Sequence, residues 1–260
     1  MANFLEKKAS SVASAVEARL LAEYGAIFLT TATPPPSIIF RDGAEVERFQ
    51  SALRTRVRRF GEHNIELQAD AMDALAAAAD ELPANGATLT PRAADSGRRS
   101  YDDTVGLWNR NVGRGLDHWL ELGKVTADRA DSIRQLPPVD QVSVILAMED
   151  DEQIYFGTFF NRSILYSVAA PGASQHLSML AFDAAEFQDE AVETTLARFG
   201  WHRTVVYDFP HFTYLGHDEA SLPALGLKQV VRDYDGRSYR FWVPALKFAN
   251  EEFAKMPHTE

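Results

Sequence analysis

Two runs of proline divide this chain into parts with different hydrophobic patterns. The first, Pro34-Pro35-Pro36, ends any helix that precedes it, because consecutive prolines cannot extend a helix. Before the second, Pro137-Pro138, apolar residues recur mainly at helical spacing, and after it aromatic and β-branched segments alternate with turn residues. These patterns predict that helices dominate the first part of the chain and strands the second.

The predicted elements follow from this pattern. Helices are predicted over 4–24, 44–60, 67–82, from a first turn with Asp102 and Asp103 to about 123, over 126–135 and over 191–199. Strands are predicted over 142–148, 153–160, 177–187, 201–214, 227–233 and 238–243, with Asp235-Gly236 as the last turn, and the stretch 87–94 has a β-prone start. Runs of strands with helices set apart indicate an α+β fold.

This order of elements also predicts a domain organisation. We expect a helical N-terminal region over 1–85, a domain with a small antiparallel sheet flanked by helices over 86–246, and a C-terminal tail over 247–260.

Charge and hydropathy exclude some classes of protein. The formal net charge is −11, whereas binding to nucleic-acid phosphates needs a basic face, so no nucleic-acid partner is expected. The basic cluster at 54–59 is interpreted as the solvated face of a predicted helix. No apolar run approaches the ~20 residues needed to span a bilayer. The first eight residues lack the apolar segment of a signal peptide.

His176 and Asp183 form the first part of a candidate metal site. The chain has no cysteine, so a zinc site would have to use histidine and carboxylate ligands. His176 follows a Pro-Gly turn and stands where a strand is predicted to begin. Asp183 lies in an apolar run, and a buried carboxylate needs a partner. A metal ion is one such partner and an arginine is another.

Asp208 and His211 form the second part, an acid-x-x-His pair. On a regular strand the two side chains would point to opposite faces, but Pro210 marks an edge or a bulge, so they could converge. A carboxylate beside a metal site can take a proton from an attacking water and return it to the leaving amine.

Together these motifs resemble those of the zinc D-Ala-D-Ala carboxypeptidases and dipeptidases of vancomycin-resistance type, which are LAS-type metallopeptidases with a hedgehog-like metal fold. Ser174-x-His176 is followed seven residues later by Asp183, and the acid-x-x-His pair comes next. Upstream, Ser-Gly-Arg-Arg-Ser-Tyr at 96–101 is similar to the Ser-Gly-Tyr-Arg-Ser turn of that family. The resemblance covers about 89–243, and the motifs come in the family's order.

The resemblance implies a role for each motif residue. It implies that His176, Asp183 and His211 bind Zn²⁺ and that Asp208 is the general base. It also implies that Arg99 binds the terminal carboxylate of the substrate, a task that suits a planar guanidinium group, and that Ser174 adds a hydrogen bond. The family normally has glutamate at the position of Asp208, which is one methylene shorter.

The implied function is zinc-dependent removal of the terminal D-alanine from bacterial peptidoglycan stem peptides that end in D-Ala-D-Ala. Such a substrate implies a periplasmic or extracellular location. Two alternatives stay open. One is a lytic endopeptidase that cuts peptide cross-bridges, and the other is a non-catalytic metal-binding module for cell-wall ligands, which the replacement of glutamate by Asp208 motivates.

Overall fold

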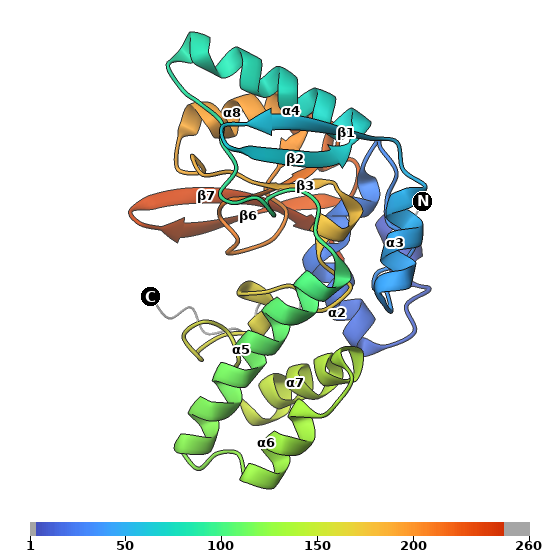
Figure 1. The fold of residues 1–260 in the computed structure, drawn as a ribbon, viewed down its shortest axis with the longest axis vertical. Coiled ribbons are helices and arrows are strands. Elements are labelled where there is room, and N and C mark those ends of the chain that lie inside the picture. The colour runs from blue at the N-terminus through green and yellow to red at the C-terminus, as the bar shows by residue number, and fades with distance from the viewer. Residues whose placement is uncertain (1–3, 247–260) are drawn as a thin grey trace.

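The computed structural model describes residues 4–246 and has an α+β fold (Figure 1). The helices are α1 (Phe4–Ala9), α2 (Ala15–Tyr24), α3 (Gly43–Ser51), α4 (Ala69–Glu81), α5 (Tyr101–Glu121), α6 (Ala127–Arg134), α7 (Pro138–Glu152) and α8 (Glu190–Arg198). The strands are β1 (Thr55–Phe60), β2 (His63–Gln68), β3 (Ala181–Asp183), β4 (Trp201–His202), β5 (His211–Tyr214), β6 (Leu227–Tyr234) and β7 (Arg237–Pro244). The predicted tail at 247–260 lies outside the described residues.

The strands form three small antiparallel sheets in the described part of the chain, where one sheet was expected. β1 pairs with β2, β6 pairs with β7, and β5 lies between β3 and β4. In Figure 1 the sheets, α4 and α8 lie at one end of the long axis and α5, α6 and α7 at the other. The central sheet sets the functional geometry, because its register places Asp183 directly opposite His211.

Several predicted elements are confirmed. The alanine-rich helix is α4, the helix after the Ser-Gly-Arg-Arg-Ser turn is α5, and α6 and α8 match their predicted ranges within two residues. Ser100 caps α5 by accepting a hydrogen bond from the Asp103 N–H, while the Asp103 carboxylate accepts one from the Ser100 N–H. The last hairpin turns at Asp235-Gly236, and both residues have positive φ.

The predicted helix over 44–60 is wrong in its second half. α3 ends at Ser51, and the segment that contains the basic cluster forms β1. Arg56 and Arg58 of this strand, and Arg54 just before it, form ion pairs with aspartates of α4. The cluster is therefore a solvated face, as expected, but it belongs to a hairpin, and the first 85 residues are not all helical.

The predicted strands at 142–148 and 153–160 are also wrong. Residues 142–148 lie in α7, which begins at Pro138. The first N–H groups of a helix have no partner within the helix, so a proline there loses no hydrogen bond. Residues 153–160 contain no strand. The longer strands predicted over 177–187 and 201–214 shrink to β3, β4 and β5, because turns occupy the rest. Similarly, the first helix breaks before Ser14, which caps α2.

Two hydrophobic clusters form most of the core, and α2 contributes to both. Leu21 packs in the cluster that contains Phe182, Trp201 and Phe212 of the central sheet. Its neighbour Leu20 packs in the cluster of α5 and α7. None of the described helices is long and apolar enough to cross a membrane.

Candidate metal centre

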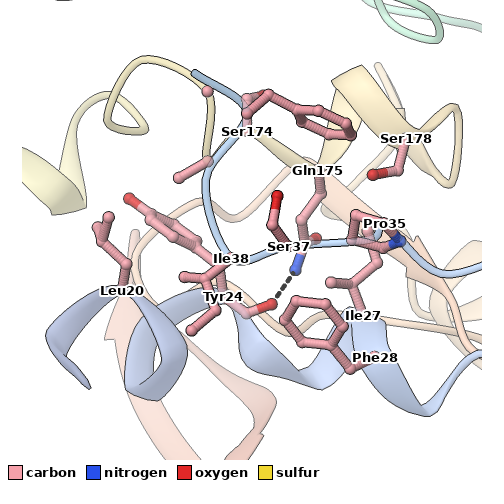
Figure 2. A pocket seen from close by; sticks show the side chains of 13 residues that line it. Leu20, Tyr24, Ile27, Phe28, Pro35, Ser37, Ile38, Ser174, Gln175 and Ser178 are labelled. Atoms are coloured by element: carbon pink, nitrogen blue, oxygen red, sulfur yellow. Dashed lines mark hydrogen bonds between the residues drawn. The ribbon is translucent and has the colours of Figure 1, made fainter. Parts of the chain in front are cut away.

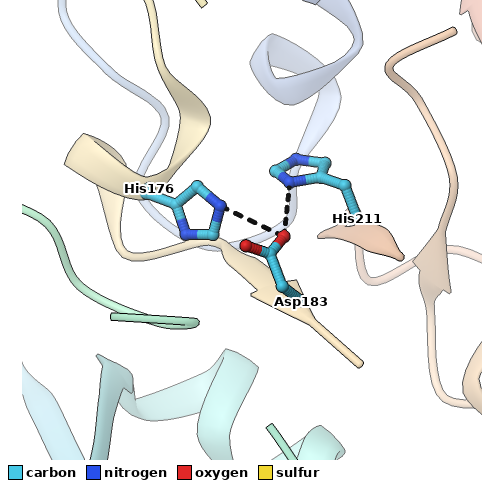
Figure 3. Close-up of side chains that lie close together, drawn as sticks. All are labelled: His176, Asp183 and His211. Atoms are coloured by element: carbon cyan, nitrogen blue, oxygen red, sulfur yellow. Dashed lines mark hydrogen bonds and ion pairs between the residues drawn. The ribbon is translucent and has the colours of Figure 1, made fainter. Parts of the chain in front are cut away.

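Three side chains from the central sheet and the turn before it converge on one point. Asp183 ends β3 and His211 begins β5, so antiparallel pairing brings them together. His176 lies in a buried 3-10 turn, Gln175–Ser178, which ends at Met179 with a φ of 56° and leads into β3. Figure 3 shows both imidazole rings pointing toward the Asp183 carboxylate. The structure thus brings together the three residues that the resemblance implied as ligands.

The distances between their atoms suit a tetrahedral ion. Asp183 Oδ1 lies 3.3 Å from His176 Nε2 and 3.1 Å from His211 Nδ1. One ligand atom from each residue lies within 4.8 Å of the other two. Ligands at about 2.1 Å from a tetrahedral zinc ion are separated by about 3.4 Å, so the two measured edges are close to those of a zinc site.

The hydrogen bond of His176 determines which of its nitrogens faces the cluster. Nδ1 lies 2.7 Å from the Gly97 carbonyl oxygen, which can only accept, so Nδ1 carries the proton. Burial lowers the pKa of His176, which keeps the ring neutral. Nε2 therefore directs a lone pair toward Asp183.

Gln175 determines the tautomer of His211 in the same way. Its Nε2 donates to the Tyr24 carbonyl oxygen over 3.0 Å (Figure 2), so its Oε1 must face the other side. Oε1 lies 2.9 Å from His211 Nε2, which must donate to it. His211 Nδ1 is then free of a proton and, like His176 Nε2, faces Asp183 Oδ1.

The electrostatics of this arrangement call for a cation. Arg99 Nη2 lies 2.8 Å from Asp183 Oδ2, and this ion pair holds the buried carboxylate in its charged form. Two imidazole lone pairs and a charged carboxylate oxygen thus meet without a proton between them, which is unfavourable unless a positive ion lies there. The residues present therefore fit a zinc ion, and the donor set of two imidazoles and one carboxylate is one that zinc accepts.

Arg99 binds the outer oxygen of Asp183 within the described structure. Its Nη2 donates to Asp183 Oδ2 over 2.8 Å, and its Nε donates to the Asp95 backbone oxygen and side chain. Asp183 thus has an arginine partner, one of the two possibilities that its burial left open. Among residues 4–246, no hydrogen bond engages Nη1 of Arg99.

Asp208 lies next to the cluster at the end of a tight turn. The His211 N–H donates to the Asp208 carbonyl oxygen over 3.2 Å, which folds the two residues onto the same side, and Asp208 Oδ2 lies 4.0 Å from His211 Nδ1. Burial in the cavity and the nearby Asp183 carboxylate raise the pKa of Asp208, against the effect of His211. Its side chain is nevertheless 48% exposed, so the carboxylate can reach a ligand in the cavity.

A cavity of about 190 Å³ contains all six residues that the motifs singled out. They are Arg99, Ser174, His176, Asp183, Asp208 and His211. Ser174 lines this cavity but is 8% exposed. Thr104, Tyr24 and Tyr166 line it as well. Sequence reasoning missed Gln175, because a glutamine between two motif residues carries no signal of its own.

The N-terminal part of the chain holds the turn that carries His176. Gln50 Nε2 donates to the Leu177 carbonyl oxygen over 3.0 Å, and Gln68 Nε2 donates to that of Ser178 over 2.8 Å. With the bond from Gln175 to Tyr24, three hydrogen bonds connect this turn to residues before 85. These contacts support the geometry of the cluster directly.

Comparison with known proteins gives one similar structure and no family assignment. No protein-family model matches this chain, and no curated protein matches it. Among solved structures, the chain is similar to a crystal structure of a mutant of the vancomycin resistance D,D-pentapeptidase VanY, from a VanB-type resistance cassette, in complex with Zn(II). The sequence identity is 15%, the match covers 64% of this chain and 82% of that chain, and the TM-score is 0.35.

Proposed function

We propose that His176, Asp183 and His211 bind Zn²⁺ and that the protein is a zinc D-alanyl-D-alanine carboxypeptidase of peptidoglycan stem peptides. The observation that carries this proposal is the convergence of three proton-free ligand atoms in a cavity that also contains a carboxylate and an arginine. Such a set of metal ligands, base and anion-binding group suits hydrolysis of a peptide with a free C-terminal carboxylate.

Zinc would supply Lewis acidity for the scissile carbonyl and lower the pKa of a water molecule. In this proposal Asp208 accepts the proton of the attacking water and delivers it to the departing amine of D-alanine. Its half-exposed position beside His211 allows this transfer.

Arg99 would hold the terminal carboxylate of the substrate through Nη1. Its Nε–H and one N–H of Nη2 are engaged by Asp95 and Asp183, which leaves both N–H groups of Nη1 for the substrate. Ser174 would add a hydrogen bond to the substrate from the cavity wall. Because the proposed substrate belongs to the cell wall, we propose that the protein acts in the periplasm or outside the cell.

Release of D-alanine from a muramyl pentapeptide by zinc-loaded protein tests the proposal. We expect release from the wild type and a loss of at least about 100-fold in kcat for Asp208→Asn, since general acid–base catalysis typically contributes that much. Zinc content, measured on the same samples, should stay unchanged in the variant. No release from the wild type at any zinc concentration would contradict the carboxypeptidase.

The cavity geometry also favours one alternative strongly enough to test it. Tyr166, Ser167 and Asp208 line both this cavity and a wider groove of about 660 Å³, which could admit longer peptides. An endopeptidase would cut a cross-linked dimeric stem and spare the free pentapeptide. A non-catalytic module would bind the pentapeptide equally well with Asp208→Asn and release nothing in either form.

A further inference from the structure

The groove beside the metal cavity is rich in arginine and aromatic side chains. We call it the arginine groove and define it by Arg92, Arg162 and Arg232 together with Phe187, Tyr207 and Tyr234. It begins where the metal cavity ends, because Asp208, Tyr166 and Ser167 line both. A ligand that fills the cavity can therefore continue into the groove.

The three arginines lie against aromatic rings. The guanidinium of Arg162 lies 4.8 Å from the centre of the Tyr207 ring, that of Arg232 lies 5.4 Å from the same ring, and that of Arg92 lies 5.9 Å from the Phe187 ring. Stacking on a ring fixes a guanidinium plane and leaves its N–H groups directed sideways. The rings thus help to hold these arginines in place and leave most of their hydrogen-bond donors free.

Within residues 4–246, none of the three forms an ion pair. Their side chains donate two hydrogen bonds within these residues, from Arg162 Nε to the neighbouring Asn161 side chain and from Arg232 Nη1 to the Val231 carbonyl oxygen. Nε of Arg232 is buried and has no partner among the described residues. The arginines in and just before β1 behave differently, since Arg54, Arg56 and Arg58 are each paired with an aspartate.

The charge of the groove is opposite to that of the whole chain. Its two carboxylates are Asp208 at the junction and Asp233, whose Oδ1 accepts a hydrogen bond from Ser238. Three arginines against two aspartates leave a positive surface on a chain with a net charge of −11. Such a local reversal of sign attracts anionic ligands, which the rest of the acidic surface repels.

We propose that the arginine groove binds the acidic residues of an extended peptide substrate, on the N-terminal side of the bond to be cut. This inference rests on the proposed function for its direction, because Arg99 lines the cavity only and would hold the C-terminal end. The residues that precede that end then lie in the groove. There the free guanidinium donors contact side-chain carboxylates, and the aromatic rings cover apolar parts of the peptide.

Direct binding of peptides that end before the D-Ala-D-Ala bond tests this proposal without turnover. Two such stem peptides, with glutamate or glutamine at the second position and otherwise identical, are titrated into the full-length wild type. We expect the glutamate peptide to bind about tenfold more tightly at low salt, and the difference to shrink as salt increases. Arg162→Gln and Arg232→Gln should each remove most of the difference, and Arg162→Lys should retain part of it.

Arg48→Gln is the matched control, because Arg48 is an exposed arginine of α3 that does not line the groove. It should leave both affinities unchanged, and melting temperatures verify that each variant folds. Equal binding of the two peptides by the wild type, or equal losses in Arg48→Gln and Arg162→Gln, would overturn the proposal. Release of D-alanine from a short neutral substrate is measured in parallel: its absence refutes the carboxypeptidase alone, whereas its presence without glutamate preference refutes the groove alone.

Discussion

Each histidine of the cluster depends on one acceptor that lies outside the cluster. The Gly97 carbonyl oxygen accepts a hydrogen bond from the Nδ1–H of His176, and Gln175 Oε1 accepts one from the Nε2–H of His211. Both acceptors orient a ring as well as choosing its tautomer, and partners of this kind typically affect metal affinity by 10- to 100-fold. The site is therefore built from five residues rather than three.

Gln175→Leu tests this dependence. It removes the acceptor for His211 Nε2 at similar volume, so the ring can rotate or shift its proton to Nδ1. We expect zinc affinity, measured by competition with a chelator, to fall by about 10- to 100-fold. Gln141→Leu is the control, since Gln141 is also a buried, hydrogen-bonded glutamine but contacts Trp108 and Ile133. It should lose stability and keep its zinc affinity; a parallel loss in both variants would contradict a specific role for Gln175.

Arg99→Ala should change two measurements at once. The variant removes the donor to Asp183 Oδ2, so zinc should bind more weakly, and it removes the proposed contact to the substrate carboxylate. With zinc at saturation, KM for a substrate with a free C-terminus should increase by about tenfold or more, since a charge-assisted hydrogen bond is worth about 1.5–3 kcal/mol. A substrate with an amidated C-terminus should show no such increase. An unchanged KM for both would exclude Arg99 from substrate binding.

At this scale the motif residues could be found from the sequence, but their supports could not. His176, Asp183, Asp208 and His211 share a spacing with a known family, and histidine and aspartate are themselves metal-ligand types. A backbone carbonyl and a glutamine amide belong to no motif. Their function depends on segments that meet only in the folded chain, such as Tyr24 with Gln175.

Among the elements, the hairpin β1–β2 determines how closely the Gly97 turn can pack. A Cβ atom at Gly97 would lie 2.7 Å from Ile65 Cγ2 and 3.1 Å from the Glu66 carbonyl oxygen, both on β2. We expect Gly97→Ala to cost about 1–3 kcal/mol, because overpacking displaces the turn. It should also weaken zinc binding, since the Gly97 carbonyl moves with it.

Gly113→Ala on α5 is the matched control for this variant. A Cβ atom there meets nothing within 4 Å, and the residue lies inside a helix. Alanine should stabilise the protein by about 0.5–1 kcal/mol in urea unfolding and leave zinc affinity unchanged. If Gly97→Ala behaved like Gly113→Ala, the packing of the turn against β2 would not limit the site.

α7 carries a buried acid that makes stability depend on pH. Glu149 Oε1 accepts hydrogen bonds from the N–H groups of Phe156 and Ile164, and burial raises the pKa of Glu149 from 4.5 to about 7. Between these values the folded protein binds more protons than the unfolded chain, so stability decreases as pH rises. The total loss should be about 2–3 kcal/mol between pH 4.5 and 8.

Urea unfolding of Glu149→Gln at pH 5 and pH 8 tests this dependence. The variant should lack the wild-type loss over this range, because its amide does not titrate. Glu152→Gln on the same helix should keep most of the wild-type profile, since Glu152 is a partly exposed partner of Arg129. A wild-type stability that rises steadily from pH 5 to pH 8 would contradict the raised pKa.

Helices and strands were predicted correctly where the hydrophobic periodicity and the capping residues indicate the same element, and wrongly where the two signals conflict. α5 combines a capping box with a buried stripe of Trp108, Val112 and Leu116, and it was predicted correctly. The segment of α7 was predicted as a strand because of its β-branched residues around Val142, although Pro138 stands at a position that favours the start of a helix. The alternating arginines of β1 were assigned to a helix because a short, solvated strand buries too little to show a clear period of two.

Across the whole molecule, the candidate centre connects the two parts of the core. β3 and β5 belong to the Phe182 cluster, whereas Ala173, just before the turn that carries His176, belongs to the Trp108 cluster. Zinc at 100-fold above its dissociation constant would stabilise the folded state by about 2.7 kcal/mol. For a chain of this size the melting temperature should then increase by about 5–10 °C.

Calorimetry with and without a chelator measures this effect. The increase should disappear in His211→Ala and persist in His202→Ala, because His202 bonds to the His217 carbonyl oxygen away from the cluster. An equal increase in both variants would place the zinc elsewhere.

The α+β class could be predicted at this scale, but the division of the chain at residue 85 stays a prediction.

The hydrogen bonds between the turn that carries His176 and Gln50, Gln68 and Tyr24 bear on how such a protein can evolve. All motif residues lie after 95, so a gene fragment that starts there would encode every proposed ligand. It would lack the three bonds that shape the turn. Recombination that moved only the motif segment into another gene would therefore transfer the ligands without their geometry, and the two halves of this chain should be inherited together.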